Sequence, residues 1–367
     1  MPRFEEEIYQ VTESHKIPGV SLLVARGEEI LYQNQFGLAS LLPLKTPLQS
    51  HHLFDIASLT KPVVTTTLLL LKRKTDRLSL DTPLVKQLPE LSEGEKERIT
   101  LRHLLKHTSG LPAWKAFYEE IRLSHPDLWG KRDCGQIYLD KISHESLEVP
   151  IAYRRIYSDL GFILLGLYLE RLQGKPLDQL FSECVASPLG LSQTRFISNE
   201  APPIDRTLFV STENSPVRQK ILQGEVHDEN AYCLGGVAGH AGLFSNSLDL
   251  HRFLYEIEKG YHGQSEFFPQ EDLHEFIGPK VKIKLGWDTP EGENSQAGIH
   301  FSRNSIGHLG YTGCSFWIDL DRKFHIILLT NRVHPSSQDE TIKTFRPRLH
   351  NLIYEELILP CLPKEST

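Results

Sequence analysis

The chain has 367 residues, enough for one large domain or for two lobes around a sizeable core. Hydrophobic residues make up 40% of the sequence and charged residues 24%, the usual composition of a globular protein in water. The net charge of −7 comes from interspersed acidic and basic residues without a long basic tract, which argues against a nucleic acid as the main partner.

Five cysteines are spread along the chain, and no two form a Cys-x-x-Cys pair. We therefore expect neither a disulfide framework nor a thiolate zinc site, and a reducing compartment fits better. Residues 1–8 lack the basic and apolar regions of a signal peptide, and the longest apolar runs are too short to span a bilayer. We expect a cytoplasmic protein with no membrane span, and prior removal of an export signal stays the alternative. The oligomeric state is open.

Residues 3–15 have the pattern of an amphipathic surface helix. Two apolar-rich runs, 20–25 and 30–36, are joined by a short polar segment with a glycine, a pattern that predicts a β-hairpin. A helix that starts near Ser58 is apolar on most sides, so we expect it to be buried and to end in the basic segment 72–74.

From residue 80 to about residue 270, helical patterns are separated by proline and glycine. The predicted helices are 100–106 with Thr100 as its N-cap, 158–172 closed by Gly174, and 248–257 with Ser247 as its cap. Between them lie two long irregular stretches, 107–135 and 192–245, and such stretches in a compact protein usually form walls or lids of a site.

Strand patterns return after about residue 280. The predicted elements are strands 282–287, 301–308, 314–319 and 324–330, and a final helix at about 339–358. Strands at both ends of the chain predict an α+β fold, with an antiparallel sheet built from N- and C-terminal segments and flanked by helices. We expect one domain in which residues 1–79 and 275–367 form the sheet lobe and residues 80–274 form an inserted, mainly helical lobe.

Ser58 and Lys61 lie three residues apart at the start of the predicted buried helix, so their side chains share one face. A serine hydroxyl becomes an effective nucleophile when an adjacent base takes its proton. A lysine partly desolvated by apolar neighbours can have its pKa lowered enough to be that base. The alternative is structural, with Ser58 as an N-cap and Lys61 as a surface residue of the first turn.

Tyr157-Ser158-Asp159 stands at the start of the predicted helix 158–172. A tyrosine at this place could reach a central site and shuttle protons if nearby cations lowered the pKa of its phenol. The commoner alternative for Tyr157 is burial with one satisfied hydroxyl. Asp159 taken alone is an acidic residue at a helix N-terminus.

The segment 307–313 is rich in glycine and precedes the predicted strand 314–319. Glycines let a backbone edge approach a ligand closely, and an edge strand offers N–H groups to an oxyanion. His308 could donate to a substrate carboxylate or assist proton transfer, and the alternative is a β-turn with an exposed histidine. Arg332 follows the last strand and could bind a substrate carboxylate, or could simply be solvated.

The segment 224–245 combines many glycines with His227, Asp228 and His240. These three side chains could be metal ligands. The density of glycine instead favours a close-packed loop over the site, with the polar side chains fixing the loop. We therefore do not expect a metal site.

The pairs Ser58/Lys61, Tyr157/Asp159 and His308/Gly310 resemble, in this chain order, the signature of the serine β-lactamase and penicillin-binding protein superfamily. Segments 55–61, 101–112 and 157–162 are similar to its class C β-lactamase-like branch, which also contains esterases, D-aminopeptidases and D-alanyl-D-alanine carboxypeptidases. The resemblance covers nearly the whole chain. It implies a β-lactamase/transpeptidase-like fold and a chemistry without metal or cofactor.

The resemblance also implies roles for the matching residues. Ser58 would be the acylated nucleophile, and Lys61 and Tyr157 would move protons during attack and deacylation. The backbone N–H groups of Ser58 and Tyr311 would form the oxyanion hole. His308 would take the place that a lysine holds in true β-lactamases.

Asp159, Gly310 and Arg332 would contact the substrate. Asp159 replaces the usual asparagine of the family, so it could pair with Lys61 and hold it charged, or recognise a substrate amine. The presence of Asp159 and His308 weakens the case for efficient β-lactam hydrolysis and favours ester or peptide-like substrates.

We therefore expect a metal-free serine hydrolase that acts through an acyl-enzyme on esters, D-amino-acid amides or peptidoglycan-derived peptides. Its expected partner is a small-molecule or peptide substrate. One alternative is a D-Ala-D-Ala carboxypeptidase or weak β-lactamase. The other is a catalytically silent binding protein on this fold.

Overall fold

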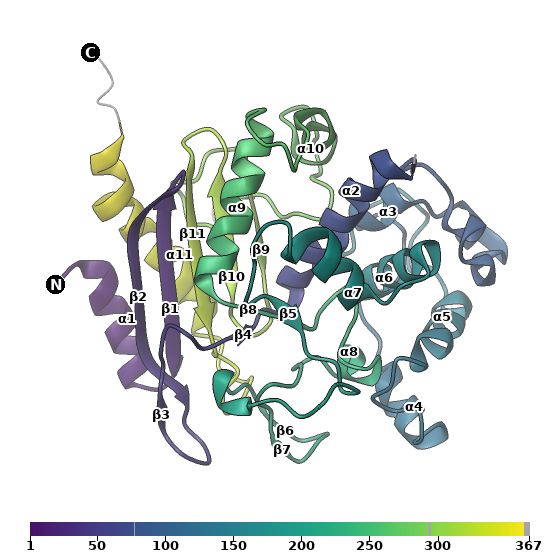
Figure 1. Cartoon of the computed structure of the whole chain (residues 1–367), viewed down its shortest axis with the longest axis horizontal. Coiled ribbons are helices and arrows are strands. Elements are labelled where there is room, and N and C mark those ends of the chain that lie inside the picture. The colour runs from purple at the N-terminus through teal and green to yellow at the C-terminus, as the bar shows by residue number, and fades with distance from the viewer. Residues whose placement is uncertain (77, 293–294, 363–367) are drawn as a thin grey trace.

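The computed structural model of the chain describes residues 1–76, 78–292 and 295–362. Its central feature is a six-stranded antiparallel sheet with the strand order β3-β2-β1-β11-β10-β9 (Figure 1). The strands are β1 (Gly19–Arg26), β2 (Glu29–Ser40), β3 (Thr46–Pro47), β9 (Ser305–Leu309), β10 (Ser315–Asp319) and β11 (Phe324–Thr330). Because β1 pairs with β11 along its whole length, the two ends of the chain form one sheet, and the α+β prediction is confirmed.

Helices cover both faces of this sheet and fill a second lobe beside it (Figure 1). The α-helices are α1 (Arg3–Glu13), α2 (Thr67–Thr75), α3 (Leu101–Leu105), α4 (Phe117–Ser124), α5 (Cys134–His144), α6 (Asp159–Gln173), α7 (Leu177–Phe181), α8 (Glu229–Cys233), α9 (Ser247–Tyr261), α10 (Gln270–Ile277) and α11 (Ile342–Ile353). Short strands form two further small sheets: β4 (Phe54–Asp55), β8 (Leu243–Ser245) and β5 (Arg195–Phe196) in one, β6 (Asn214–Ser215) and β7 (Lys220–Ile221) in the other.

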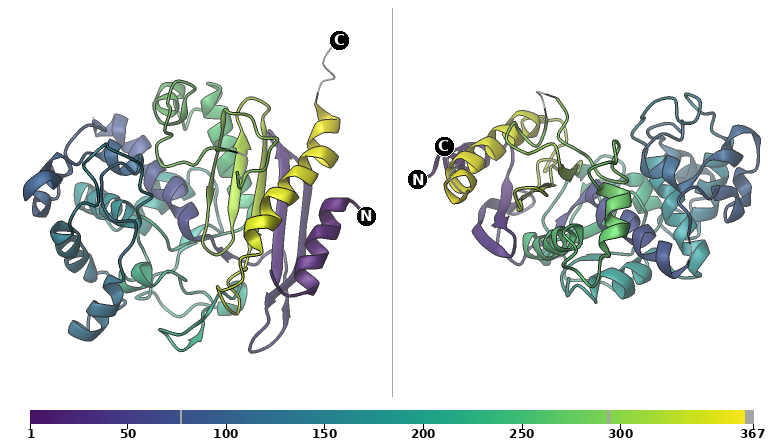
Figure 2. Two further views of the ribbon diagram at one scale, coloured as in Figure 1. Left: turned by 180° about the vertical axis from the view of Figure 1, so that it is seen from behind. Right: turned by 90° about the horizontal axis from the view of Figure 1, so that it is seen from above.

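The alternation of side chains along β1 divides the core of the sheet lobe into two layers. Val20, Leu22 and Val24 pack with α1 and α11, which lie together on one face of the sheet (Figure 2). Leu23 and Ala25 point to the opposite face, where α9 packs against β1 and β11. Successive side chains of a strand point to opposite faces, so a continuous apolar run such as β1 has both of its faces buried.

Helix α6 lies in the core of the helical lobe and fixes the position of the residues before it. The hydroxyl of Ser158 accepts a hydrogen bond from the N–H of Gly161 and caps the helix. Gly174 ends the helix with a φ of +63°. Because most of the helix is buried, its N-terminus holds Tyr157 and Asp159 in one place.

The predicted strand 282–287 is wrong. Gly286 adopts a φ of +74°, and its N–H donates to the carbonyl of Leu105 in the helical lobe. In the described part of the chain, an isolated bridge between Asp288, directly after this segment, and Gly307 of β9 is the one ladder contact at this place. A left-handed glycine and a backbone hydrogen bond to another element prevent the continuous ladder that the apolar pattern suggested.

Two helix boundaries were predicted with different success. Thr100 caps α3, because its hydroxyl accepts from the N–H of His103. The prediction of Ser247 as the cap of α9 is wrong, because Asn246 occupies that position and accepts from the N–H of Asp249 at 2.9 Å. The stretches predicted to be irregular contain short elements, among them α4, α8 and β5 to β8, within long loops.

The division into 1–79 with 275–367 and 80–274 stays a prediction. Helix α9 belongs to 80–274 by sequence but packs on the sheet. Within the described residues, none of the helices combines the length and the apolar character that a bilayer crossing requires.

Buried histidines make the stability of this fold sensitive to acid. Burial lowers the pKa of His325 and of His350 to about 3, from an ordinary value of 6.5. Each ring must stay neutral in the folded state, whereas the unfolded chain takes up the proton below pH 6.5. We expect each histidine to lower the free energy of unfolding by about 2 kcal/mol at pH 5. The melting temperature should therefore fall between pH 7 and pH 5. His325→Gln should flatten this dependence and the exposed His144→Gln should not; a melting temperature constant over this range would contradict the prediction.

Candidate functional site

The turn that carries Ser58 follows β4 and is fixed by a hydrogen bond to the side chain of Asp55. A carboxylate oxygen of the buried Asp55 accepts from the N–H of Ala57 at 2.8 Å, and Ala57 adopts a φ of +48°. Ser58 lies in the 3₁₀ turn Ala57–Leu59, and Lys61 opens the π-type turn Lys61–Thr66 that continues into α2. The spacing places both side chains on one face, as the sequence predicts.

The ammonium group of Lys61 is fully buried and has two hydrogen-bond acceptors and one ion-pair partner. Its Nζ lies 2.7 Å from Oδ1 of Asp159, 2.8 Å from Oγ of Ser58 and 3.1 Å from the carbonyl of His240. Burial alone would lower the pKa of Lys61, but the adjacent carboxylate of Asp159 outweighs it, and the pKa is raised. The prediction of a lysine with a lowered pKa is therefore wrong for this state. Of the two roles considered for Asp159, pairing with Lys61 is the one present.

The ring of Tyr157 lies over this ammonium group, with Nζ of Lys61 5.0 Å from the ring centroid. Burial raises the pKa of the Tyr157 phenol to about 12, although the charge of Lys61 opposes the shift. A phenol with a pKa lowered by cations was the condition for the predicted shuttle, and that condition is not met in this state.

Sequence reasoning missed His107, which packs behind Tyr157 at a ring distance of 4.5 Å. Its Nδ1 accepts from the N–H of Ser158, and its pKa is held well below the ordinary value by burial and by the nearby charge of Lys61. His107 therefore packs against the ring of Tyr157 as a neutral imidazole. The only signal in the sequence was its place in the segment 101–112.

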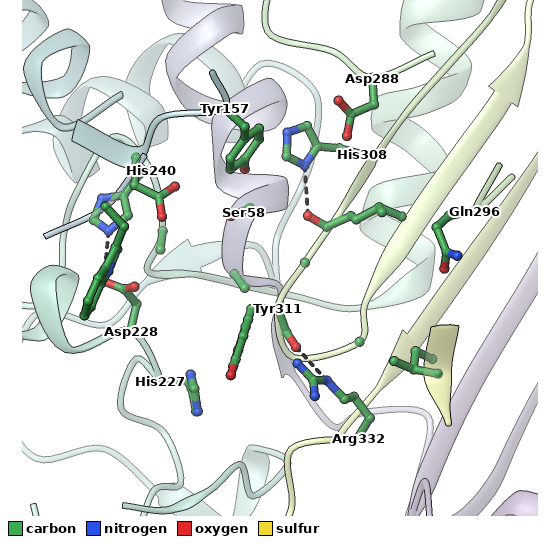
Figure 3. Close-up of a pocket in the computed structure, with 18 of the residues that line it drawn as sticks. Ser58, Tyr157, His227, Asp228, His240, Asp288, Gln296, His308, Tyr311 and Arg332 are labelled. Atoms are coloured by element: carbon green, nitrogen blue, oxygen red, sulfur yellow. Dashed lines mark hydrogen bonds and ion pairs between the residues drawn. The ribbon is translucent and has the colours of Figure 1, made fainter. Parts of the chain in front are cut away.

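The β9–β10 turn closes the other side of Ser58 (Figure 3). A Cβ atom on Gly310 would lie 2.6 Å from the carbonyl of Ile56, so only glycine allows this turn so close to the Ser58 turn. His308 is buried on β9, its Nδ1 donates to the carbonyl of Leu309 at 3.0 Å, and burial lowers its pKa. The alternative considered for His308, an exposed histidine in a β-turn, is therefore wrong.

The segment 227–240 contacts both Asp55, which fixes the Ser58 turn, and the side chain of Lys61. The N–H of His227 donates to the second carboxylate oxygen of Asp55 at 2.6 Å, while its ring contacts Glu213 at 3.0 Å. Asp228 lies 2.8 Å from Nε2 of His240, which lowers the pKa of Asp228. His227 and His240 thus pair with different carboxylates, and no cluster of three metal-ligating side chains occurs in the described parts of the chain.

These side chains surround a cavity of about 910 Å³ (Figure 3). The predicted site residues that line it are Ser58, Tyr157, Asp159, His308, Gly310, Tyr311 and Arg332, together with His227, Asp228 and His240. Lys61 is fully buried and is not among the lining residues. The two long loops supply much of the wall, including Trp114, Tyr118 and Glu213, which were not singled out in the sequence. The expectation that these loops form walls is confirmed.

Comparison with protein families agrees with this geometry. The model of the family described as Beta-lactamase matches residues 4–347. The chain belongs to this family. The structure thus has the β-lactamase-like fold, and the protein is a serine hydrolase.

Two curated proteins are similar to this chain over most of their length. The "N-acetylmuramyl-L-alanine amidase" of Bacillus subtilis (strain 168) is 32% identical, with 86% of this chain and 78% of that protein covered. The "Putative D-alanyl-D-alanine carboxypeptidase" of Escherichia coli (strain K12) is 29% identical, with 88% of this chain and 80% of that protein covered.

Two solved structures share the fold at lower identity. "EstCE1, a hydrolase with promiscuous acyltransferase activity" superposes with a TM-score of 0.73 at 21% identity, covering 96% of this chain and 97% of its own. A class C β-lactamase superposes with a TM-score of 0.70 at 19% identity, covering 95% and 98%. At these identities the likeness concerns the fold alone.

The contact between Asp159 and Lys61 predicts a pH effect. Asp159→Asn removes the carboxylate that raises the pKa of Lys61, so burial dominates and the pKa falls. If neutral Lys61 is the active form, kcat should rise at a pH that is at least about one pH unit lower in the variant than in the wild type.

The matched control is Asp178→Asn, which breaks a carboxylate–arginine contact of 2.6 Å with Arg132, outside the residues that line the cavity. It should leave the pH profile in place. A profile that stays unmoved in Asp159→Asn would contradict the prediction.

Proposed function

We propose that the protein hydrolyses amide bonds of peptidoglycan-derived peptides through an acyl-enzyme formed on Ser58. The observation that carries this proposal is the contact of Oγ of Ser58 with a buried lysine that also contacts Asp159 and lies under Tyr157. A serine with such a partner, at the wall of a large cavity, is suited to nucleophilic catalysis.

In the proposed first step, Oγ of Ser58 bonds to the carbonyl carbon of the substrate. The hydroxyl proton leaves to the pair formed by Lys61 and Tyr157, which returns it to the departing nitrogen. The backbone N–H groups of Ser58 and Tyr311 stabilise the oxyanion. Water then attacks the acyl-enzyme, the same pair takes a proton from the water, and the proton returns to Oγ as the acid leaves.

Lys61 must be neutral to receive a proton, and Asp159 opposes this in the free enzyme. A substrate N–H that donates to Asp159 would weaken the electrostatic stabilisation of charged Lys61 by this carboxylate. Binding of an amide with an N–H beside the scissile bond would thereby lower the pKa of the base. Amides are therefore favoured over simple esters, which lack that donor.

The choice of substrate class is supported by the names of the two curated relatives, "N-acetylmuramyl-L-alanine amidase" and "Putative D-alanyl-D-alanine carboxypeptidase". Hydrolysis of esters or D-amino-acid amides by the same site is the wider proposal, and a D-Ala-D-Ala carboxypeptidase is the second candidate. Five unbonded cysteines suit a reducing compartment, so we propose a cytoplasmic enzyme that recycles or detoxifies such compounds.

The nucleophile is tested by intact-mass measurement after incubation with a fluorophosphonate. The wild-type protein should gain one adduct, and Ser58→Ala should gain none. Lys61→Ala should react slower by several orders of magnitude, as expected for loss of a proton-transfer partner. Ser143→Ala removes a hydroxyl that donates to the Asp140 carbonyl in α5 and should label like the wild type. An adduct that persists in Ser58→Ala would rule out the assignment.

A further inference from the structure

Two buried cysteines lie side by side in the helical lobe, and neither lines the cavity. Cys134 is the first residue of α5, and Cys233 is the last residue of α8. Their sulfur atoms are 3.8 Å apart, and they are the one pair of cysteines in contact within the described parts of the chain. Because the two residues are 99 positions apart in the sequence, their spacing does not reveal the contact.

The segments that carry the two sulfur atoms are held together at residues before and after Cys134. Before it, the rings of Trp129 and Tyr232 pack with their centroids 4.9 Å apart. After it, the hydroxyl of Tyr138 on α5 donates to the side-chain oxygen of Asn230 on α8 at 2.7 Å. The contact between the thiols is therefore a fixed feature of the packing of α5 against α8.

The thiol contact is close to the geometry of a covalent bond. The sulfur atoms of a disulfide are about 2.05 Å apart, so the two atoms must approach each other by about 1.8 Å. Rotation of the two side chains with small shifts of the helix ends supplies such a movement. The contact of the Cys134 Sγ with the carbonyl of Leu128, now 2.9 Å, would be released in the process.

The two thiols differ in reactivity. Contact with the Cys134 thiol lowers the pKa of the Cys233 thiol, so Cys233 is the sulfur that ionises more readily. Both side chains are fully buried, which restricts the reaction to a small oxidant that enters by local opening. The turns of segment 125–133 cover Cys134 through Leu128 and are the nearest place for such an opening.

We propose that Cys134 and Cys233 are a modification site, at which a hydroperoxide converts the two thiols into a reversible disulfide that joins α5 to α8. In a reducing compartment the pair stays in the thiol form, and the bond forms when the protein meets the oxidant. This inference goes beyond the proposed function and does not rest on it.

With hydrogen peroxide as the oxidant, the reaction has two steps. The Cys233 sulfur bonds to one peroxide oxygen, the O–O bond breaks, and the other oxygen leaves as water with the proton of the Cys233 thiol. The Cys134 sulfur then bonds to the Cys233 sulfur, the S–O bond breaks, and the hydroxyl group leaves as water with the proton of the Cys134 thiol. Two electrons pass from the two sulfur atoms to the peroxide, so two thiols and one peroxide give one disulfide and two waters.

The bond would fix a loop that contacts the catalytic residues. Asp228 caps α8 and also lies 2.8 Å from Nε2 of His240, whose carbonyl contacts Lys61. Cys233 lies between these ends, so a bond to α5 would attach the loop 228–240 to the helical lobe. A cross-link between residues so far apart in sequence also restricts the unfolded chain and should stabilise the protein.

The site is tested on the full wild-type chain with hydrogen peroxide, followed by iodoacetamide to block the remaining free thiols. Peptide mass mapping without a reductant should give one linked pair, Cys134 with Cys233, and dithiothreitol should restore both thiols. The melting temperature of the oxidised protein should be at least about 3 °C above that of the reduced protein. Fluorophosphonate labelling of Ser58 should persist after oxidation, because neither cysteine lines the cavity.

Cys233→Ala should abolish both the linked peptide and the rise in melting temperature. The matched control is Cys184→Ala, which removes a partly buried thiol outside the pair and should keep both effects. Free Cys134 and Cys233 in a sample whose exposed Cys361 is oxidised would overturn the inference. So would a linked protein with an unchanged or lower melting temperature. Because the link is mapped in the wild-type chain and Ser58 labelling is measured separately, failure of this site and failure of the proposed function give different results.

Discussion

The buried ammonium group of Lys61 is the interaction on which the site depends. An isolated ammonium in the interior would lose its proton or unfold the surroundings, because desolvation disfavours its charge. Here each of its partners comes from a different segment: Ser58 from its own turn, Asp159 from the start of α6, and the carbonyl of His240 from the glycine-rich loop. The ion therefore ties the helical lobe to the turn of the nucleophile.

A second constraint comes from the way the sheet is built. Pairing of β1 with β11 joins the ends of the chain and places the β9–β10 turn against the Ser58 turn. Gly310 permits that approach, while Asp55 binds the backbone of both Ala57 and His227. The rigid parts of the fold thus set the distance between the nucleophile and the proposed oxyanion donor, and the long loops are left to line the cavity.

The sequence was sufficient for the order of the motifs, the hairpin, the Thr100 cap and the α+β class, because those features depend on local spacing and on apolar patterns. It was insufficient where a property depends on a distant partner. The pKa of Lys61 rises because Asp159 lies 2.7 Å away, which spacing along the chain does not reveal. Likewise segment 282–287 has a strand pattern that Gly286 interrupts through a contact with the helical lobe.

The most direct measurement is an NMR titration of the lysine ammonium signals, with the signal of Lys61 assigned by its loss in Lys61→Arg. The account predicts that Lys61 in the free enzyme stays charged at pH values above its ordinary pKa of 10.5, and that it titrates at lower pH in Asp159→Asn. A Lys61 that is already neutral at pH 7 in the wild-type protein would contradict the account, because Asp159 would then not hold the charge.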